Sequence, residues 1–166
     1  MFVETPRIRL EPITPELARR ILARDEREGD AWHPEYPFAD ELDVLRGVAE
    51  SSEQHPVFGA YLVRRRSDGL AVGGLGFFGP PDEQGRVEFG YGLVAGARGA
   101  GLATEAVRAA LAHAAAHGAR SAAADTEVGN LASRRVLEKA GLVEVRRSAG
   151  SIRFECDLDT VRDPAV

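Results

Sequence analysis

The segment 98–105 joins a predicted strand to a predicted helix and is rich in small residues. It reads Arg98-Gly99-Ala100-Gly101-Leu102-Ala103-Thr104-Glu105. The first amides of a helix have no partner inside the helix, and the aligned peptide dipoles make that end electropositive. Glycine and alanine let phosphate oxygens approach these amides closely. The segment therefore predicts a site for a ligand that carries phosphate groups.

Other phosphate-binding loops differ from this one at specified positions. The lysine of a nucleoside-triphosphate loop is absent, and Thr104 stands where the dinucleotide fingerprint has its last glycine. A helix entrance that is glycine-rich for structural reasons alone is the alternative interpretation. The ligand class must therefore come from the rest of the sequence.

Three carboxylates on predicted strands near this loop are candidates for acid–base chemistry. Glu88 lies on the strand that leads into the loop, and Asp125 and Glu127 lie near the end of the next strand along the chain. Proton transfer requires a carboxylate or a histidine near the reacting group. An exposed strand carboxylate without a chemical role is the alternative for Glu88.

Two other residue types that often carry chemistry are expected to be inert here. His113 and His117 are spaced to share one helix face, but no third metal ligand lies near them, so we expect no metal site. The single cysteine, Cys156, alternates with apolar residues on the last predicted strand. We expect its thiol to pack in the core and to take no part in catalysis.

The composition excludes several classes of protein. The chain has 166 residues, a formal net charge of −5 and one cysteine, so we expect one compact domain without disulfides. No apolar run has the length of a membrane helix, and the first residues do not resemble a secretion signal, so we expect a cytoplasmic protein. The acidic balance argues against nucleic acid and favours a cationic partner, such as an amine or a basic peptide.

The elements that position the loop alternate between helices and strands. A threonine before a proline predicts the start of the first helix at Thr14, and Gly118 and Gly141 are typical of helix ends. Three strands with short connections predict an antiparallel meander before the loop. The predicted strands span 7–10, 57–65, 70–78, 86–94, 120–128, 142–147 and 151–158, and the predicted helices span 15–28, about 42–48, 103–117 and 131–140.

Two motifs in this order resemble the GNAT superfamily of N-acetyltransferases. The pyrophosphate loop of that family has Arg or Gln, then Gly three residues later, then Gly or Ala two residues after that. Arg98, Gly101 and Ala103 fill these places. The helix that begins Asn130-Leu131-Ala132-Ser133 and ends at Gly141 is similar to the family's second motif.

Details of the sequence look most like one branch of that superfamily, the ribosomal-protein N-terminal (RimJ/RimL-like) acetyltransferases. The similar features are Asn130 with Ser133, the strand 87–91 and the loop Trp32-His33-Pro34. The resemblance covers the chain from Thr5 to about Leu158.

The resemblance implies a fold. Residues 1–158 would form a single α/β (α+β) GNAT domain, followed by a C-terminal tail at 159–166. The domain would have a mixed, mostly antiparallel central sheet of about seven strands, flanked by about four helices. The fourth and fifth strands would splay apart and admit the pantetheine arm of coenzyme A.

The resemblance also implies roles for residues. Glu88 would be the general base, and Ser133 would serve the departing thiolate, because Leu137 stands where the family usually has a tyrosine. Acetyl-coenzyme A would be bound, without a metal, by Leu93, Val94, Arg98, Gly99, Ala100, Gly101, Leu102, Ala103, Thr104 and Asn130. The acceptor would lie against Trp32, Tyr36, Phe77 and Phe78.

Two functions are compatible with these motifs. The first is transfer of an acetyl group from acetyl-coenzyme A to a primary amine, either a peptide N-terminus or a small amine, by direct attack in a ternary complex. The second is an acyl-coenzyme A binder or sensor without catalysis, because the usual tyrosine is missing. The sequence leaves open the acceptor and whether the protein is a monomer or a homodimer.

Overall fold

The computed structural model describes residues 2–159. The elements in chain order are β1 (Val3–Glu4), β2 (Ile8–Pro12), α1 (Pro15–Leu22), α2 (Leu42–Glu50), β3 (Ala60–Arg65), β4 (Ala71–Phe77), β5 (Arg86–Leu93), α3 (Leu102–Ala116), β6 (Ser121–Glu127), α4 (Leu131–Lys139), β7 (Val143–Arg147) and β8 (Ser151–Asp157). Short 3-10 turns lie at Ala39–Glu41 and Ala95–Ala97. The predicted α/β class is confirmed.

The strands form one sheet in the order β1-β2-β3-β4-β5-β6-β8-β7. The predicted meander is confirmed, since β3, β4 and β5 pair antiparallel in succession. The sheet has eight strands, one more than predicted, because the two-residue β1 pairs with β2. A strand this short has no alternating pattern from which it could be recognised.

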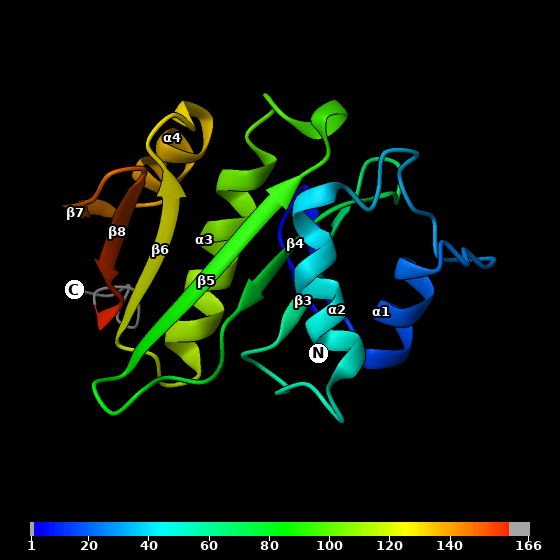
Figure 1. Ribbon diagram of the computed structural model, residues 1–166, viewed down its shortest axis with the longest axis horizontal. Helices are drawn as coiled ribbons and strands as arrows, with labels where there is room; N and C mark the ends of the chain where they lie inside the picture. Colours follow the sequence, from blue (N-terminus) through cyan, green and yellow to red (C-terminus); the bar gives the residue numbers. More distant parts are fainter. Residues whose placement is uncertain (1, 160–166) are drawn as a thin grey trace.

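The sheet opens between β5 and β6. These two strands are parallel and pair only at Arg86–Glu88 with Ser121–Ala123, although β5 continues to Leu93. Figure 1 shows β5 and β6 diverging from their shared lower end, with α3 behind the opening. The predicted splay between the fourth and fifth strands is confirmed, since β1 lies outside that count.

Helices cover both faces of the sheet. Figure 1 shows α2 in front of β3 and β4 with α1 beside it, whereas α3 lies behind the sheet with α4 beside it. The core between these layers is apolar, and its largest fully buried side chains include Tyr61, Phe89 and Phe154. None of the helices in the described part of the chain combines the length and apolar character needed to cross a membrane.

The first helix begins as predicted and ends earlier. The Thr14 hydroxyl accepts from the Leu17 N–H at 3.1 Å, which caps α1. The prediction that this helix continues to residue 28 is wrong, since α1 ends at Leu22 and Arg24 has a positive φ of 54°. Asp30 accepts hydrogen bonds from the guanidinium of Arg20 and from the N–H of Arg27. These bonds hold the segment between α1 and Asp30 against the helix.

The remaining predicted elements lie within a few residues of the observed ones. Cys156 is half-buried on β8, and burial raises the pKa of its thiol to about 11. A thiol with such a pKa carries almost no thiolate at neutral pH, which agrees with the expectation that it is not a nucleophile. The predicted tail at 159–166 lies, except for Asp159, outside the described residues.

Candidate functional site

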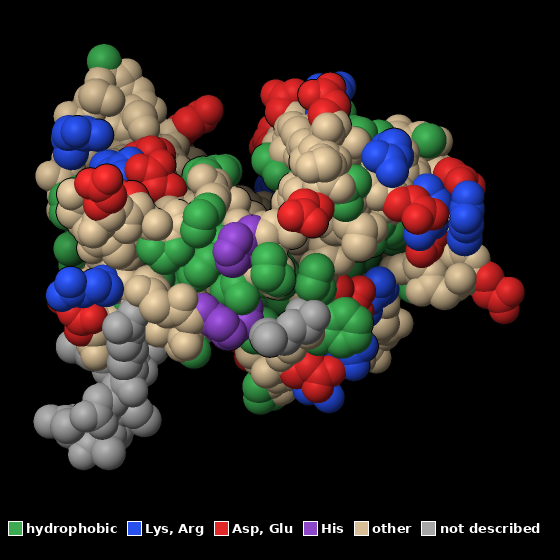
Figure 2. All heavy atoms as spheres, turned by 90° about the horizontal axis from the view of Figure 1, so that it is seen from below, with side chains coloured by type: hydrophobic (Ala, Val, Ile, Leu, Met, Phe, Trp, Pro, Cys, Tyr) green, Lys and Arg blue, Asp and Glu red, His purple; other side chains and the backbone are tan. Residues whose placement is uncertain are grey.

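A cavity of about 660 Å³ lies along the open side of β5. Its walls come from β4, β5, the glycine-rich loop and parts of α2, α3 and α4. Figure 2, seen from the lower end of the molecule, shows a notch between the part that holds β6 to β8 and the part that holds α1 and α2. Predicted site residues that line the cavity are Leu93, Arg98, Gly99, Gly101, Leu102, Ala103, Thr104, Asn130, Ser133 and Phe78.

The loop presents open backbone at the start of α3. The Glu105 N–H donates to the Gly101 carbonyl at 3.1 Å, so the amides before Glu105 have no helical acceptor. Gly101 is the N-cap, with a φ of 80°, and Gly99 has a φ of 86°. No atom lies within 4 Å of the place where a Cβ on Gly99 would stand. The loop therefore has the space and the donors that an anion needs.

Arg7 fixes the shape of this loop from the far side. Its Nη1 donates to the Ala100 carbonyl at 2.6 Å, and its Nε donates to the Glu105 carboxylate at 3.3 Å. In the sequence, Arg7 is only the first residue of the predicted strand 7–10. Its partners are more than 90 residues away, so no local pattern could have identified this contact.

The backbone of β5 leaves one edge free. The Val94 N–H donates to the Val72 carbonyl at 2.8 Å, and the Glu88 carbonyl accepts from the Phe78 N–H at 2.9 Å. Backbone groups alternate in direction along a strand, so the even-numbered residues bond to β4. β5 and β6 pair as far as Glu88 with Ala123. The N–H and C=O groups of Tyr91 and Leu93, beyond that pair, therefore point toward the side that β6 leaves open.

This pattern separates the two residues predicted at the end of β5. Leu93 lies on the free edge, and its carbonyl accepts from the Nε of Arg98 at 3.0 Å. The Val94 N–H is already bonded to Val72, so it has no capacity to bind a ligand. The free edge extends instead toward Tyr91.

Three side chains connect β5 to α4 across the opening. The hydroxyls of Tyr91 and Ser133 lie 2.8 Å apart, and Asn130 Oδ1 accepts from the Ser133 N–H at 3.1 Å. Asn130 thus caps α4, a structural role that is separate from its predicted contact with the cofactor. Burial raises the pKa of Tyr91, so its phenol stays protonated and can donate. Tyr91 was missed because Ser133 lies 42 residues away.

A buried carboxyl group also faces the cavity, and no motif indicated it. Glu41 is only 9% exposed, and neither carboxylate oxygen makes a hydrogen bond within the described residues. Burial raises the pKa of Glu41 to about 8, and the nearby Tyr36 hydroxyl lowers it by a smaller amount. In the sequence, Glu41 stands among acidic residues that are typical of an exposed helix start.

The carboxylates predicted as bases lie elsewhere. Glu88 is exposed on β5, and Arg153 Nη2 donates to its Oε1 at 2.5 Å. Arg153 Nη1 also donates to Asp125 at 3.1 Å, so the two carboxylates share one guanidinium. Glu127 is exposed at the end of β6. None of the three lines the cavity, and the role of Glu88 as the base stays a prediction.

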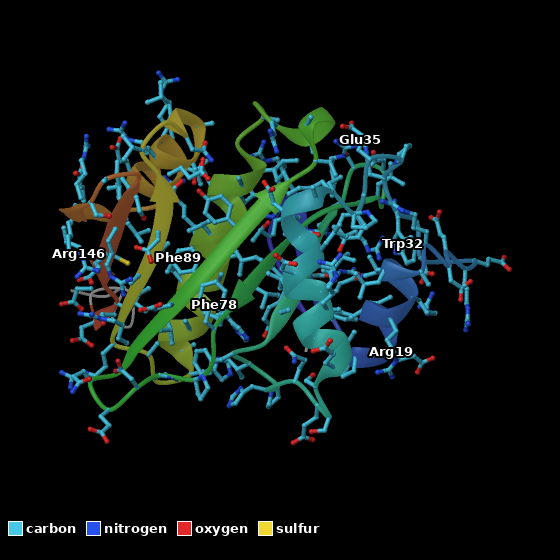
Figure 3. The ribbon with its side chains drawn as sticks, in the orientation of Figure 1. Arg19, Trp32, Glu35, Phe78, Phe89 and Arg146 are labelled. Carbon is cyan, nitrogen blue, oxygen red and sulfur yellow. The ribbon has the colours of Figure 1, made fainter. Side chains whose placement is uncertain are left out.

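The four aromatic residues predicted for the acceptor site are not brought together. Phe78 lines the cavity and is 66% exposed, whereas Phe77 is buried in the core against Phe58 and Phe89. Figure 3 shows Trp32 and Phe78 on opposite sides of α2. Trp32 and Tyr36 are buried outside the lining, so of the four only Phe78 can contact a ligand there directly.

Comparisons with known proteins agree on one family. The family model described as acetyltransferase (GNAT) domain matches residues 7–143. An uncharacterized N-acetyltransferase of Bacillus subtilis, YjdG, is 27% identical over 157 residues, which cover 90% of this chain and 94% of that protein.

Solved structures share the fold at lower identity. A GNAT-family acetyltransferase from Bacillus anthracis superposes with a TM-score of 0.69 at 17% identity, covering 96% of this chain and 99% of the other. RimL, the ribosomal L7/L12 alpha-N-protein acetyltransferase in complex with coenzyme A, superposes with a TM-score of 0.69 at 14% identity and the same two coverages.

Proposed function

This chain belongs to the acetyltransferase (GNAT) domain family, whose members use acetyl-coenzyme A, and we propose that it moves the acetyl group directly to a primary amine in a ternary complex. The observation that carries the proposal is the free edge of β5, which continues into the open amides of the glycine-rich loop. An extended arm that ends in a pyrophosphate matches both parts of this surface.

The chain's own residues have separate tasks in binding acetyl-coenzyme A. The amides of 99–104 and the guanidinium of Arg98 would bind the pyrophosphate. The free edge of Tyr91 and Leu93 would pair with the amides of the pantetheine arm, as an added strand does. An N–H of this edge would also polarise the thioester carbonyl, because such donors stabilise the charge that develops on oxygen.

A hydroxyl group on α4 would donate a hydrogen bond or a proton to the departing sulfur. Ser133 is the predicted group, and its hydroxyl is bonded to the Tyr91 phenol. A phenol that stays protonated can donate to the Ser133 oxygen, which makes the serine a better donor toward a thiolate. In this way Tyr91 supplies a phenol to a family site where Leu137 replaces the usual tyrosine.

The acceptor is expected to be cationic before it reacts. Asp40 and Glu41 line the cavity, and the chain as a whole carries a net charge of −5. One solved structure of this fold is named for acetylating the alpha-amino group of a ribosomal protein. Peptide N-termini therefore come first in the search for an acceptor, followed by polyamines and other small amines.

Thiol release from acetyl-coenzyme A tests this proposal. The wild-type chain is incubated with acetyl-coenzyme A and a panel of N-terminal peptides, polyamines and amino acids, while calorimetry measures cofactor binding. We expect saturable, acceptor-dependent thiol release with at least one amine. Tight binding of acetyl-coenzyme A without release on any acceptor would instead establish a non-catalytic acyl-coenzyme A binder.

A further inference from the structure

Glu41 is a buried acid that the structure does not satisfy. Both of its carboxylate oxygens are shielded from solvent and make no hydrogen bond within residues 2–159. The residue directly precedes α2, yet its side chain does not cap that helix. Burying a carboxyl group without a partner is unfavourable, so such a group in a cavity calls for an explanation.

The absence of a side chain at Gly74 lets this carboxyl group lie directly on the sheet. A Cβ on Gly74 would come within 2.2 Å of Glu41 Oε1. Gly74 pairs with Gly92 on β5, where a Cβ would meet the ring of Phe38 at 2.6 Å. Neighbouring strands lie about 4.8 Å apart, so Glu41 is about one strand away from β5, whose free edge binds the pantetheine arm in the proposed function.

The charged residues that line the cavity come from separate elements. The basic ones, Arg98, Arg135 and Lys139, come from the glycine-rich loop and α4. The acidic ones, Asp40 and Glu41, come from the turn before α2, and the apolar Phe38, Val44 and Phe78 also line the cavity. The elements proposed to bind the cofactor thus supply basic side chains, and the turn before α2 supplies carboxylates.

Other ionisable groups surround Glu41 without neutralising it. Tyr36 lies next to it and makes no hydrogen bond of ordinary geometry. The Tyr61 hydroxyl is committed to the Val57 carbonyl at 2.6 Å and faces His113 at 3.3 Å. The ionisable groups that share the cavity with Glu41 are Asp40, Tyr61, Tyr91, Arg98, Arg135 and Lys139.

We propose that Glu41 binds the ammonium group of the acceptor and removes its proton, which makes it the general base of the transfer. This inference rests on the proposed function and assigns a residue to it. The ammonium would satisfy the unpaired carboxylate, while Phe38, Val44 and Phe78 would contact the rest of the acceptor. The acceptor class is accordingly a primary amine that is positively charged in solution and has an apolar neighbouring segment.

The proton transfers balance with Glu41 in this role. One proton moves from the ammonium to the Glu41 carboxylate, and the nitrogen lone pair then forms the N–C bond with the acetyl carbonyl. The C–S bond breaks with its electron pair on sulfur, and a second proton moves from nitrogen to that sulfur by way of the Ser133 hydroxyl. The products are the amide, coenzyme A as a thiol, and protonated Glu41, which returns its proton to water.

Burial prepares Glu41 for this task. A pKa of about 8 lies close to neutral pH. A general base with such a pKa binds a proton strongly, and part of its population is still deprotonated and able to accept one. A bound ammonium favours the charged carboxylate and lowers this pKa. Activity should therefore rise with pH as the free enzyme loses the Glu41 proton.

The test compares Glu41→Gln with Asp43→Asn. Asp43 is an exposed carboxylate on the first turn of α2, so its substitution removes a carboxyl group close to Glu41 in the chain but outside the cavity. We expect Glu41→Gln to lower kcat/KM for the amine at least 100-fold and to leave the Kd for acetyl-coenzyme A within about twofold. Asp43→Asn should retain kcat/KM. Retained acetyl-coenzyme A affinity shows that the Gln variant is folded.

A pH profile separates catalysis from a structural role. The wild-type kcat/KM should rise with an apparent pKa near 8, and this limb should be absent from the residual activity of Glu41→Gln. An active wild type whose profile is unchanged in Glu41→Gln would overturn the role of Glu41 alone. Loss of the limb in Glu88→Gln instead would assign the base to Glu88. No turnover by the wild type on any acceptor would overturn the proposed function and this role with it.

Discussion

At the scale of single residues, the protonation of Glu41 links stability to pH. Its pKa of about 8 in the folded protein lies above the ordinary value of 4.5, so the folded state binds the proton more tightly than the unfolded chain. The stability from this group is present below pH 4.5 and is lost as pH rises through 8. The loss is on the order of 5 kcal/mol in free energy of unfolding.

We therefore expect Glu41→Gln to become more stable relative to the wild type as the pH rises. Glutamine cannot ionise, so it avoids the cost of a buried carboxylate at high pH. Calorimetric melting of both proteins between pH 5 and pH 9 measures the effect. A difference in Tm that stays constant over this range would mean that Glu41 is not a buried, titrating carboxyl group.

Gly74→Ala should disturb the same group from the sheet side. Its Cβ would overlap Glu41 Oε1, and overpacking of this kind typically costs about 1–3 kcal/mol. Gly76→Ala is the matched control for stability, because its Cβ meets only Ala60, at 3.7 Å. Urea unfolding compares the variants. Equal stabilities for the two would show that Glu41 moves aside freely.

Residues in motifs can be proposed from the sequence more readily than residues that act through distant contacts. Gly99 and Gly101, which line the cavity, could be proposed because a phosphate loop requires small residues at fixed spacing. Glu41 and Tyr91 could not, because their partners Gly74 and Ser133 are separated from them by 33 and 42 residues. A carboxylate at the start of a helix is usually exposed to solvent. Glu41 is buried only because the folded sheet lies against it.

At the scale of elements, the site depends on the way β5 leads into α3. Gly101 has a φ of 80°, and a side chain there would approach Arg7 Nη2, at 3.2 Å from a Cβ. Gly101→Glu should therefore abolish acetyl-coenzyme A binding, because it places a negative charge where phosphates bind. Titration calorimetry measures the affinity.

Gly118→Glu controls for that substitution. Gly118 also has a positive φ, of 101°, and lies just beyond the other end of α3 with open space around it. It carries the same strain and the same charge far from the loop, so acetyl-coenzyme A binding should persist. Retained affinity in Gly101→Glu would mean that the loop does not bind the phosphates.

The contact between β5 and α4 predicts coupled effects. Tyr91→Phe and Ser133→Ala each remove one partner of the 2.8 Å hydrogen bond. We expect each to lower kcat by about tenfold and the double variant to lower it no further, because residues that act as a unit are not additive. Multiplied effects in the double variant would show that the two hydroxyls act independently.

The strands and helices around the site could be predicted where the residues of the element itself carry the signal. The meander, α3 and α4 have clear periodicity and glycine ends, so they lie within a few residues of their predicted bounds. The extra length predicted for α1 was wrong because the chain turns back after Leu22, where Asp30 accepts hydrogen bonds from Arg20 and from the Arg27 N–H. The prediction for Val94 did not anticipate its hydrogen bond to Val72, since strand register is not visible in sequence.

At the scale of the whole molecule, the net charge of −5 conceals a division of charge. The proposed function places the phosphates at helix amides and Arg98, whereas Asp40 and Glu41 line the cavity from the turn before α2. A count of charged residues does not register backbone donors. The acidic balance is therefore an argument about the acceptor, and the proposed function has both substrates in the cavity beside the opening between β5 and β6.

Mass spectrometry of the acceptor tests direct acetyl transfer at this cavity most directly. After incubation with acetyl-coenzyme A and the best amine of the panel, we expect wild-type protein to add one acetyl group to the acceptor and none to itself. The Gly101→Glu variant should leave the acceptor unchanged. An acceptor that gains no acetyl group, or an acetyl group that accumulates on the protein itself, would contradict direct transfer.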